Sequence, residues 1–87
     1  MPKPNKFDGM MHEICVGIGF CGQSLRGLIP ASGEVSAEEF IEWVFEAEDM
    51  KEIDRMSFQK TLMEIFIKHM GSQEVDASQL HSDYKGA

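Results

Sequence analysis

The stretch SAEEFIEWVFEAED, residues 36–49, contains the clearest helix start in the chain. Ser36 and Glu39 have the spacing of a capping box, in which each side chain bonds the free backbone N–H of the other residue. Apolar residues then recur at steps of three and four, which is the period of an α-helix and not the alternation of a strand. We therefore predict a helix over residues 37–49. Its apolar positions form an arc wide enough to pack on more than one neighbour: Phe40, Ile41, Trp43, Val44, Phe45 and Ala47.

The helical period resumes further along the chain and predicts a second helix over residues 56–70. Its apolar residues form two adjacent faces that together cover nearly half of the circumference, so we expect it to be the most buried helix. One face holds Phe58, Leu62, Ile65, Phe66 and His69, and the other holds Met56, Met63, Ile67 and Met70. Gly71 stands where a left-handed C-terminal cap belongs. Residues 72–87 are expected to be either a short docking helix or a disordered segment.

Towards the N-terminus, apolar residues at helical spacing predict a helix over residues 10–28, although four glycines weaken it. Pro30 cannot continue a helix, so the element must end before it. Residues 1–8 are expected to form a flexible tail. The predicted fold class is therefore all-α, a small bundle of three main helices in one domain spanning residues 9–71, and no strand is predicted.

The segment CVGIGFCG, residues 15–22, contains the glycine spacing of a dinucleotide-binding loop. That loop requires a preceding strand and a βαβ unit, and the helical pattern here offers neither. We therefore interpret Gly17, Gly19 and Gly22 as positions where neighbouring backbones approach closely. Val16 and Phe20 lie on the polar side of this helix, where they either contact the C-terminal segment, which we favour, or belong to a contact surface.

The charge balance narrows the range of binding partners. Fifteen acidic against eight basic residues give a net charge of −7. Such a chain lacks the basic face that nucleic acids and anionic membranes require, so we expect it to bind neither. No apolar run is long enough to cross a bilayer, and the N-terminus lacks the apolar stretch of a secretory signal. A cytoplasmic location is the expectation that follows.

The turn between the first two predicted helices resembles the second half of an EF-hand calcium loop. Gly33 matches the glycine of the loop, Val35 its inward aliphatic residue, Glu39 its terminal glutamate and Phe40 the following aromatic residue. A similar turn occurs in the metal-associated helical domains of tellurite-resistance-type proteins. The resemblance implies a metal- or ligand-responsive helical domain with a degenerate EF-hand-like turn. Calcium needs six to eight oxygen ligands, however, and of the first-half positions Leu28, Pro30 and Ser32, only Ser32 offers a side-chain oxygen.

No arrangement of residues points to catalysis or to a bound transition metal. Cys15 and Cys21 are too far apart on a helix for a disulfide and lack the further ligands of a zinc site. The three histidines show no i, i+4 pairing with one another or with a cysteine. We therefore expect no enzyme, no cofactor and no metal site. A nucleophilic cysteine at one of these two positions is the weakest alternative.

The most distinctive feature is a concentration of acidic residues between positions 34 and 54, with nine acids and one base. Several lie on one side of the predicted helix 37–49. Glu46 and Asp49 stand near its C-terminus, where the helix dipole disfavours negative charge. This face is either a solvated surface or a docking face for a basic protein, with an aromatic anchor from Trp43, Phe20 or Phe45. The predicted partner-binding residues are Glu38, Glu42, Trp43, Glu46, Asp49 and Phe20.

We therefore expect a non-enzymatic, acidic protein-protein interaction module that binds a basic protein partner. An inhibitor, an immunity-type partner of a nuclease toxin or an adaptor protein would fit this description. Association with a second copy of the chain is left open. The alternative from another class is the metal- or ligand-responsive domain implied by the turn at Gly33 to Glu39.

Overall fold

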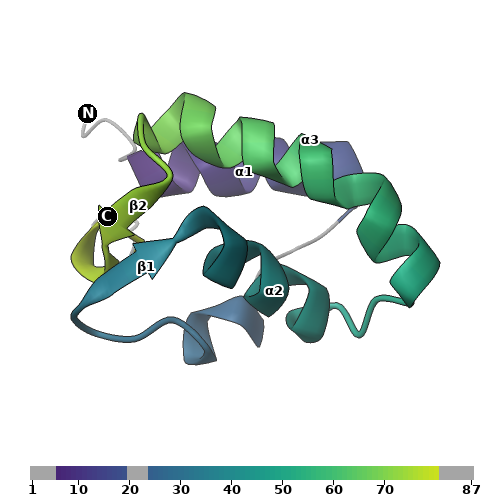
Figure 1. Cartoon of the computed structure of the whole chain (residues 1–87), viewed down its shortest axis with the longest axis horizontal. Coiled ribbons are helices and arrows are strands. Elements are labelled where there is room, and N and C mark those ends of the chain that lie inside the picture. Colours follow the sequence, from purple (N-terminus) through teal and green to yellow (C-terminus); the bar gives the residue numbers. More distant parts are fainter. Residues whose placement is uncertain (1–5, 20–23, 81–87) are drawn as a thin grey trace, which may run out of the picture.

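The computed structural model describes residues 6–19 and 24–80, and three α-helices form most of this described part (Figure 1). This confirms the predicted all-α class, with a two-stranded sheet as a minor addition. The longest helix, α3, packs against both α1 and α2. The elements in chain order are α1 (Lys6–Ile18), η1 (Ser24–Gly27), β1 (Glu34–Ser36), α2 (Ala37–Ala47), α3 (Glu52–Met70), β2 (Glu74–Asp76) and η2 (Ala77–Leu80), where η denotes a 3-10 helix.

The first helix differs from its predicted range of residues 10–28 at both ends. It begins at Lys6, and Phe7 is buried, so the last three residues of the predicted tail belong to the helix. It ends at Ile18, because Gly19 adopts a φ of 72° and donates its N–H to the carbonyl of Cys15. Glycine reaches this left-handed conformation without a steric penalty. Leu25 and Ile29 follow the end of α1 and are also buried. The apolar spacing in the sequence therefore continues past the end of the helix.

The second helix, α2, begins as predicted. Ser36 is its N-cap in extended conformation, its hydroxyl accepts the N–H of Glu39, and the Glu39 carboxylate accepts the N–H of Ser36. This capping box is the one that the sequence predicts. The helix ends at Ala47, two residues before the predicted end, and Glu48 is its C-cap.

The third helix, α3, begins four residues earlier than predicted, at Glu52. Its N-cap, Lys51, makes no side-chain capping bond. Glu52 and Asp54 in the first turn are instead favoured by the positive end of the helix dipole. At the other end, Gly71 forms the predicted left-handed cap with a φ of 76°. The burial of α3 is concentrated in its second half, where the buried residues are Leu62, Ile65, Phe66 and Met70.

Strands β1 and β2 form a two-stranded antiparallel sheet that the sequence analysis did not predict. Val35 lies opposite Val75 at the centre of the pairing, and both side chains are buried. Ala37 N–H donates to the carbonyl of Gln73, and Ala77 N–H donates to that of Gly33, each at 2.7 Å. Three residues per strand are too few for a recognisable alternation. Pairing of segments 40 residues apart therefore comes from tertiary structure and not from local pattern.

This sheet brings the C-terminal segment into the domain. After β2, the 3-10 helix η2 buries both Ala77 and Leu80. Of the two expectations for this segment, the short docking helix is the one that the described residues favour, because η2 packs against α1 after β2. The domain therefore extends past the predicted boundary at residue 71. Residues 81–87 lie outside the described part of the chain.

The hydrophobic core lies between the helices and is continuous with the sheet. The rings of Phe40 on α2 and Phe66 on α3 lie 5.4 Å apart at a tilt of 46°, a favourable geometry for an aromatic pair. The α1 residues Met10 and Ile14 are fully buried in the same cluster. Within the described residues, no charged or polar side chain is buried. Apolar burial is therefore the main source of stability.

A cluster of charged groups at the surface joins α1 to the end of α3. Lys68 Nζ and His69 Nε2 each lie 2.9 Å from Oε1 of Glu13. The bond to His69, followed by the bond to Lys68, lowers the pKa of Glu13 below its usual 4.5. The ionised carboxylate of Glu13 is therefore favoured in the folded chain.

We expect this cluster to make the stability pH-dependent. A carboxylate with a lowered folded pKa contributes stability above its unfolded pKa, and the contribution is lost as the pH falls through the folded value. Glu13→Gln should therefore destabilise the chain at neutral pH and have little effect at acidic pH below the folded pKa of Glu13. Chemical denaturation of both proteins across this range measures the difference.

The stability of the Glu13→Gln variant should still fall in part at acidic pH, because the backbone N–H of Ser78 lowers the pKa of Asp76. Parallel stability curves for the wild-type chain and Glu13→Gln at all pH values would rule out the Glu13 contribution.

Candidate functional site

The acidic residues of α2 lie together on the side of the helix that faces away from the core. At about 100° per residue, Glu38, Glu42 and Glu46 occupy one side, and Asp49 follows in the same direction after the helix ends. All four residues are exposed. We call these four residues the acidic stripe. The side chains on the opposite arc are buried: Ala37, Phe40, Ile41, Val44 and Phe45.

Most of the acidic stripe is not neutralised by the residues that the structure describes. Glu42 lies 3.9 Å from Arg55 Nη1, a long and exposed ion pair. For Glu38, Glu46 and Asp49 the structure shows no ion pair with any residue in the ranges 6–19 and 24–80. Such exposed carboxylates remain available to an external cation.

Arg55 has a structural role at the corner between α2 and α3. Its Nε donates to the carbonyl of Met50 at 2.8 Å, and its guanidinium lies 5.7 Å from the centre of the Phe45 ring. Arginine often stacks on aromatic rings in this way. Arg55 therefore contacts the turn and one ring, and its ion pair with Glu42 is longer than its hydrogen bond to Met50.

The end of α2 has the hydrogen bonds of a Schellman motif. Met50 N–H donates to the carbonyl of Phe45, and Asp49 N–H donates to that of Glu46. Asp49 occupies the position with left-handed conformation, at a φ of 49°. Glycine is the usual residue there, since a β-carbon disfavours this conformation. Asp49 also adds negative charge at the end of α2 where the helix dipole disfavours it.

The predicted aromatic anchors differ in accessibility. Trp43 is half-buried, beside the acidic stripe and packed partly against the core. Phe45 is only 2% exposed, so its suggested role as an anchor is wrong. It lies on the buried arc, next to Ile41. Phe20 falls outside the described residues, and its predicted role stays a prediction.

The glycine-rich segment does not have the packing role that we predicted. A β-carbon added at Gly17 or Gly19 would meet no atom within 4 Å, so close packing does not explain either glycine. Gly19 serves the helix end instead, and Gly22 lies outside the described residues. Val16 is 75% exposed, so it does not pack against the C-terminal segment. This stretch leads out of a helix and not out of a strand, contrary to the geometry of a dinucleotide loop.

The EF-hand-like turn is present in its backbone form. Gly33 has a φ of 102°, and Val35 is buried in β1. The Glu39 carboxylate, which would be the terminal ligand, accepts hydrogen bonds from Ser36 in the capping box. A second helix, glycine turn and short strand follow at α3, Gly71 and β2. In the part of the chain that the structure describes, no three His, Cys, Asp or Glu side chains are grouped to hold a metal ion.

Sequence reasoning missed the exposed apolar residues at the start of α3. Met56 is 75% exposed and Ile53 is 72% exposed. Met56 was assigned to a buried face, because its spacing to Met63 and Met70 fits the period of the core. Figure 1 shows that the first turns of α3 extend beyond the ends of α1 and α2. Spacing alone gives no signal of where neighbouring helices end.

Comparisons with protein-family models, curated proteins and solved structures find no match to this chain. Among the described helices, none has the length and apolar character needed to cross a membrane. Arguments about function therefore rest on the residues themselves.

We expect Asp49→Gly to raise the free energy of unfolding by about 1 kcal/mol. Glycine removes the penalty of the left-handed conformation, and the substitution also removes a charge that the helix dipole disfavours. Thermal or chemical denaturation measures the gain. Asp49→Asn is the matched control, because it removes the charge and retains the β-carbon, so a smaller gain of a few tenths of a kcal/mol is expected. A glycine variant no more stable than the asparagine variant would contradict the conformational part of the argument.

Proposed function

We propose that this chain is a non-enzymatic interaction module in which the acidic stripe on α2 binds a basic surface of another protein. The observation that carries the proposal is that Glu38, Glu46 and Asp49 are exposed and, among the described residues, without an ion pair. Partner binding would explain why Glu46 and Asp49 lie at the end of the helix where negative charge weakens it.

The energetic argument concerns the C-terminal end of α2. Glu46, Glu48 and Asp49 place three negative charges at the negative end of the helix dipole. Asp49 also adopts a conformation that glycine adopts at lower cost. A sequence selected for folding alone would place lysine and glycine at these positions. Retention of acids there supports a role for their charge at the surface.

Binding would proceed by long-range attraction followed by short-range contact. A net charge of −7 and a focused acidic stripe attract a basic partner and raise the association rate. Trp43, half-buried beside the stripe, supplies the apolar contact that fixes the orientation. Inhibition of the partner, immunity to a toxin and adaptor function all use this mechanism.

The test is a pull-down of partners from the native cell, with elution by salt, followed by charge reversal. Glu46→Lys combined with Asp49→Lys should weaken binding of the captured basic partner by roughly tenfold at low ionic strength. Lysine at the C-terminal end of α2 is favoured by the dipole, and thermal denaturation of the variant checks that reduced affinity does not reflect loss of folding. Surface plasmon resonance at several salt concentrations measures both affinity and association rate.

The matched control is Glu34→Lys combined with Glu64→Lys. Both residues are exposed and lie outside the acidic stripe, and the change in net charge is the same. Equal weakening by the two double variants would show that net charge alone governs binding. Binding that ignores both salt and the Glu46/Asp49 reversal would place the interface elsewhere and refute the proposal.

A metal- or ligand-responsive domain remains the second candidate, favoured by the pairing of two glycine turns through β1 and β2. We expect calorimetric titration with calcium to give no binding heat, since Glu39 is engaged with Ser36. A saturable heat, abolished by Glu39→Gln, would favour this second candidate over the first.

A further inference from the structure

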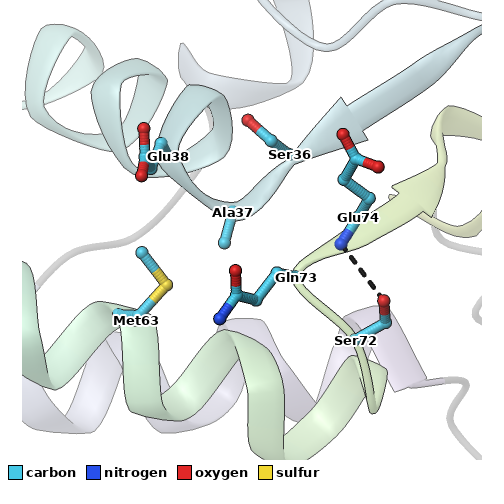
Figure 2. Close-up of a pocket in the computed structure, with 7 residues that line it drawn as sticks. All are labelled: Ser36, Ala37, Glu38, Met63, Ser72, Gln73 and Glu74. Carbon is cyan, nitrogen blue, oxygen red and sulfur yellow. Dashed lines mark hydrogen bonds between the residues drawn. The ribbon is translucent and has the colours of Figure 1, made fainter.

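Two hollows lie along the seam between α2 and α3. One, of about 370 Å³, lies between the start of α2 and the segment that follows α3 (Figure 2). The other, of about 500 Å³, lies near the corner where the chain turns from α2 into α3. The first is lined by Ser36, Ala37, Glu38, Met63, Ser72, Gln73 and Glu74, and the second by Glu42, Phe45, Met50, Glu52, Arg55, Met56 and Gln59.

The lining residues show that the two hollows follow one another along a single seam. On α2, Glu38 lines the first hollow and Glu42, one helical turn later, lines the second. On α3, Met63 lines the first and Met56 the second, two turns or about 10 Å apart along the helix axis. Gln59 lies between these methionines in the sequence. We call this pair of hollows the α2–α3 groove.

The two walls of the α2–α3 groove have different chemistry. The α2 wall carries the carboxylates of Glu38 and Glu42, whereas the α3 wall carries the thioethers of Met56 and Met63 together with the polar residues Glu52, Arg55 and Gln59. Figure 2 shows Met63 projecting from α3 towards Ala37 and Glu38. Met56 is largely exposed, and methionine adapts its flexible side chain to different apolar partners. An occupant that complements the groove therefore carries cationic groups for these carboxylates and apolar groups that meet Met56 and Met63.

The charge of the groove is negative even after its single lining cation is counted. The lining residues include the carboxylates of Glu38, Glu42, Glu52 and Glu74 and the guanidinium of Arg55. Arg55 already binds the Met50 carbonyl and stacks on Phe45. A second copy of this chain, with a net charge of −7, would face these carboxylates with its own negative charge. A cationic occupant is the complementary one.

We propose that the α2–α3 groove binds an amphipathic, basic α-helix of a partner protein. The inference deepens and rests on the proposed function, because it names the kind of segment that the acidic module binds. Two methionines seven residues apart on α3 match apolar side chains seven residues apart on the partner helix. Carboxylates four residues apart on α2 match lysine or arginine side chains at the same spacing.

The probe is a short synthetic helical peptide of lysine and leucine, with its leucines on one face and lysines beside them. A second peptide has the same composition in shuffled order, so that it has the same charge and no apolar face. We expect the amphipathic peptide to bind at least tenfold more tightly than the shuffled one, by fluorescence anisotropy. Methyl NMR should show shifts at Met56 and Met63 and little change at the fully buried Met10.

The variant that tests the groove is Met56→Ser, which is tolerated by the fold because the side chain is exposed. We expect it to weaken binding of the amphipathic peptide roughly tenfold and that of the shuffled peptide little. Val16→Ser and Ile53→Ser are matched controls, since these side chains are 75% and 72% exposed and line neither hollow. Both controls should bind the amphipathic peptide as the wild-type chain does.

The outcomes separate this inference from the proposed function. Salt-sensitive binding of both peptides with equal affinity, unaffected by Met56→Ser, would overturn the groove and leave the acidic stripe as a charge-only interface. A loss upon Val16→Ser or Ile53→Ser as large as that upon Met56→Ser would also overturn it. Sedimentation that shows a dimer of this chain, dissociated by Met56→Ser, would overturn the inference and indicate that a second copy occupies the groove. Failure of both peptides and of the native partner to bind would refute the proposed function itself.

Discussion

The pairing of Val35 with Val75 is the contact on which the arrangement of the helices depends. These two residues join β1 to β2, and through them the turn before α2 is held beside the turn after α3. Both side chains are buried in the same core cluster as Phe40 and Phe66. The reciprocal bonds from Ala37 to Gln73 and from Ala77 to Gly33 fix the register at both ends. The sheet thus holds the start of α2 beside the end of α3, while the short turn between Ala47 and Glu52 joins the two helices at their other ends.

The sequence predicts those elements whose signals are local. The capping box at Ser36 and Glu39, the glycine cap at Gly71 and the apolar arc of α2 depend on neighbours within a few residues, and the structure confirms them. The end of α1 at Gly19 was missed, because the burial of Leu25 and Ile29 continues the same period after the helix has ended. The sheet was missed because its hydrogen bonds join distant segments.

The same difference between local signals and contacts of distant segments applies to the candidate site. The acidic stripe could be placed from spacing, since helical geometry alone directs Glu38, Glu42 and Glu46 to one side. Exposure could not be assigned in this way: Phe45 is buried and Met56 is exposed, although both belong to apolar patterns. The difference arises from where the neighbouring helices end, which no single helix encodes. Arg55, which links the two sides of the corner through Met50 and Phe45, likewise becomes visible only in three dimensions.

The register of the small sheet also governs what can be added to it. Glu34 lies opposite Asp76, and Ser36 lies opposite Glu74, so carboxylates occupy both ends of the paired strands. A third strand approaching either open edge would meet this negative charge before it could form a ladder of hydrogen bonds. The negative charge of Glu34 and Asp76, which lie opposite one another and disfavour their own pairing, would thus also disfavour addition of a strand from another chain.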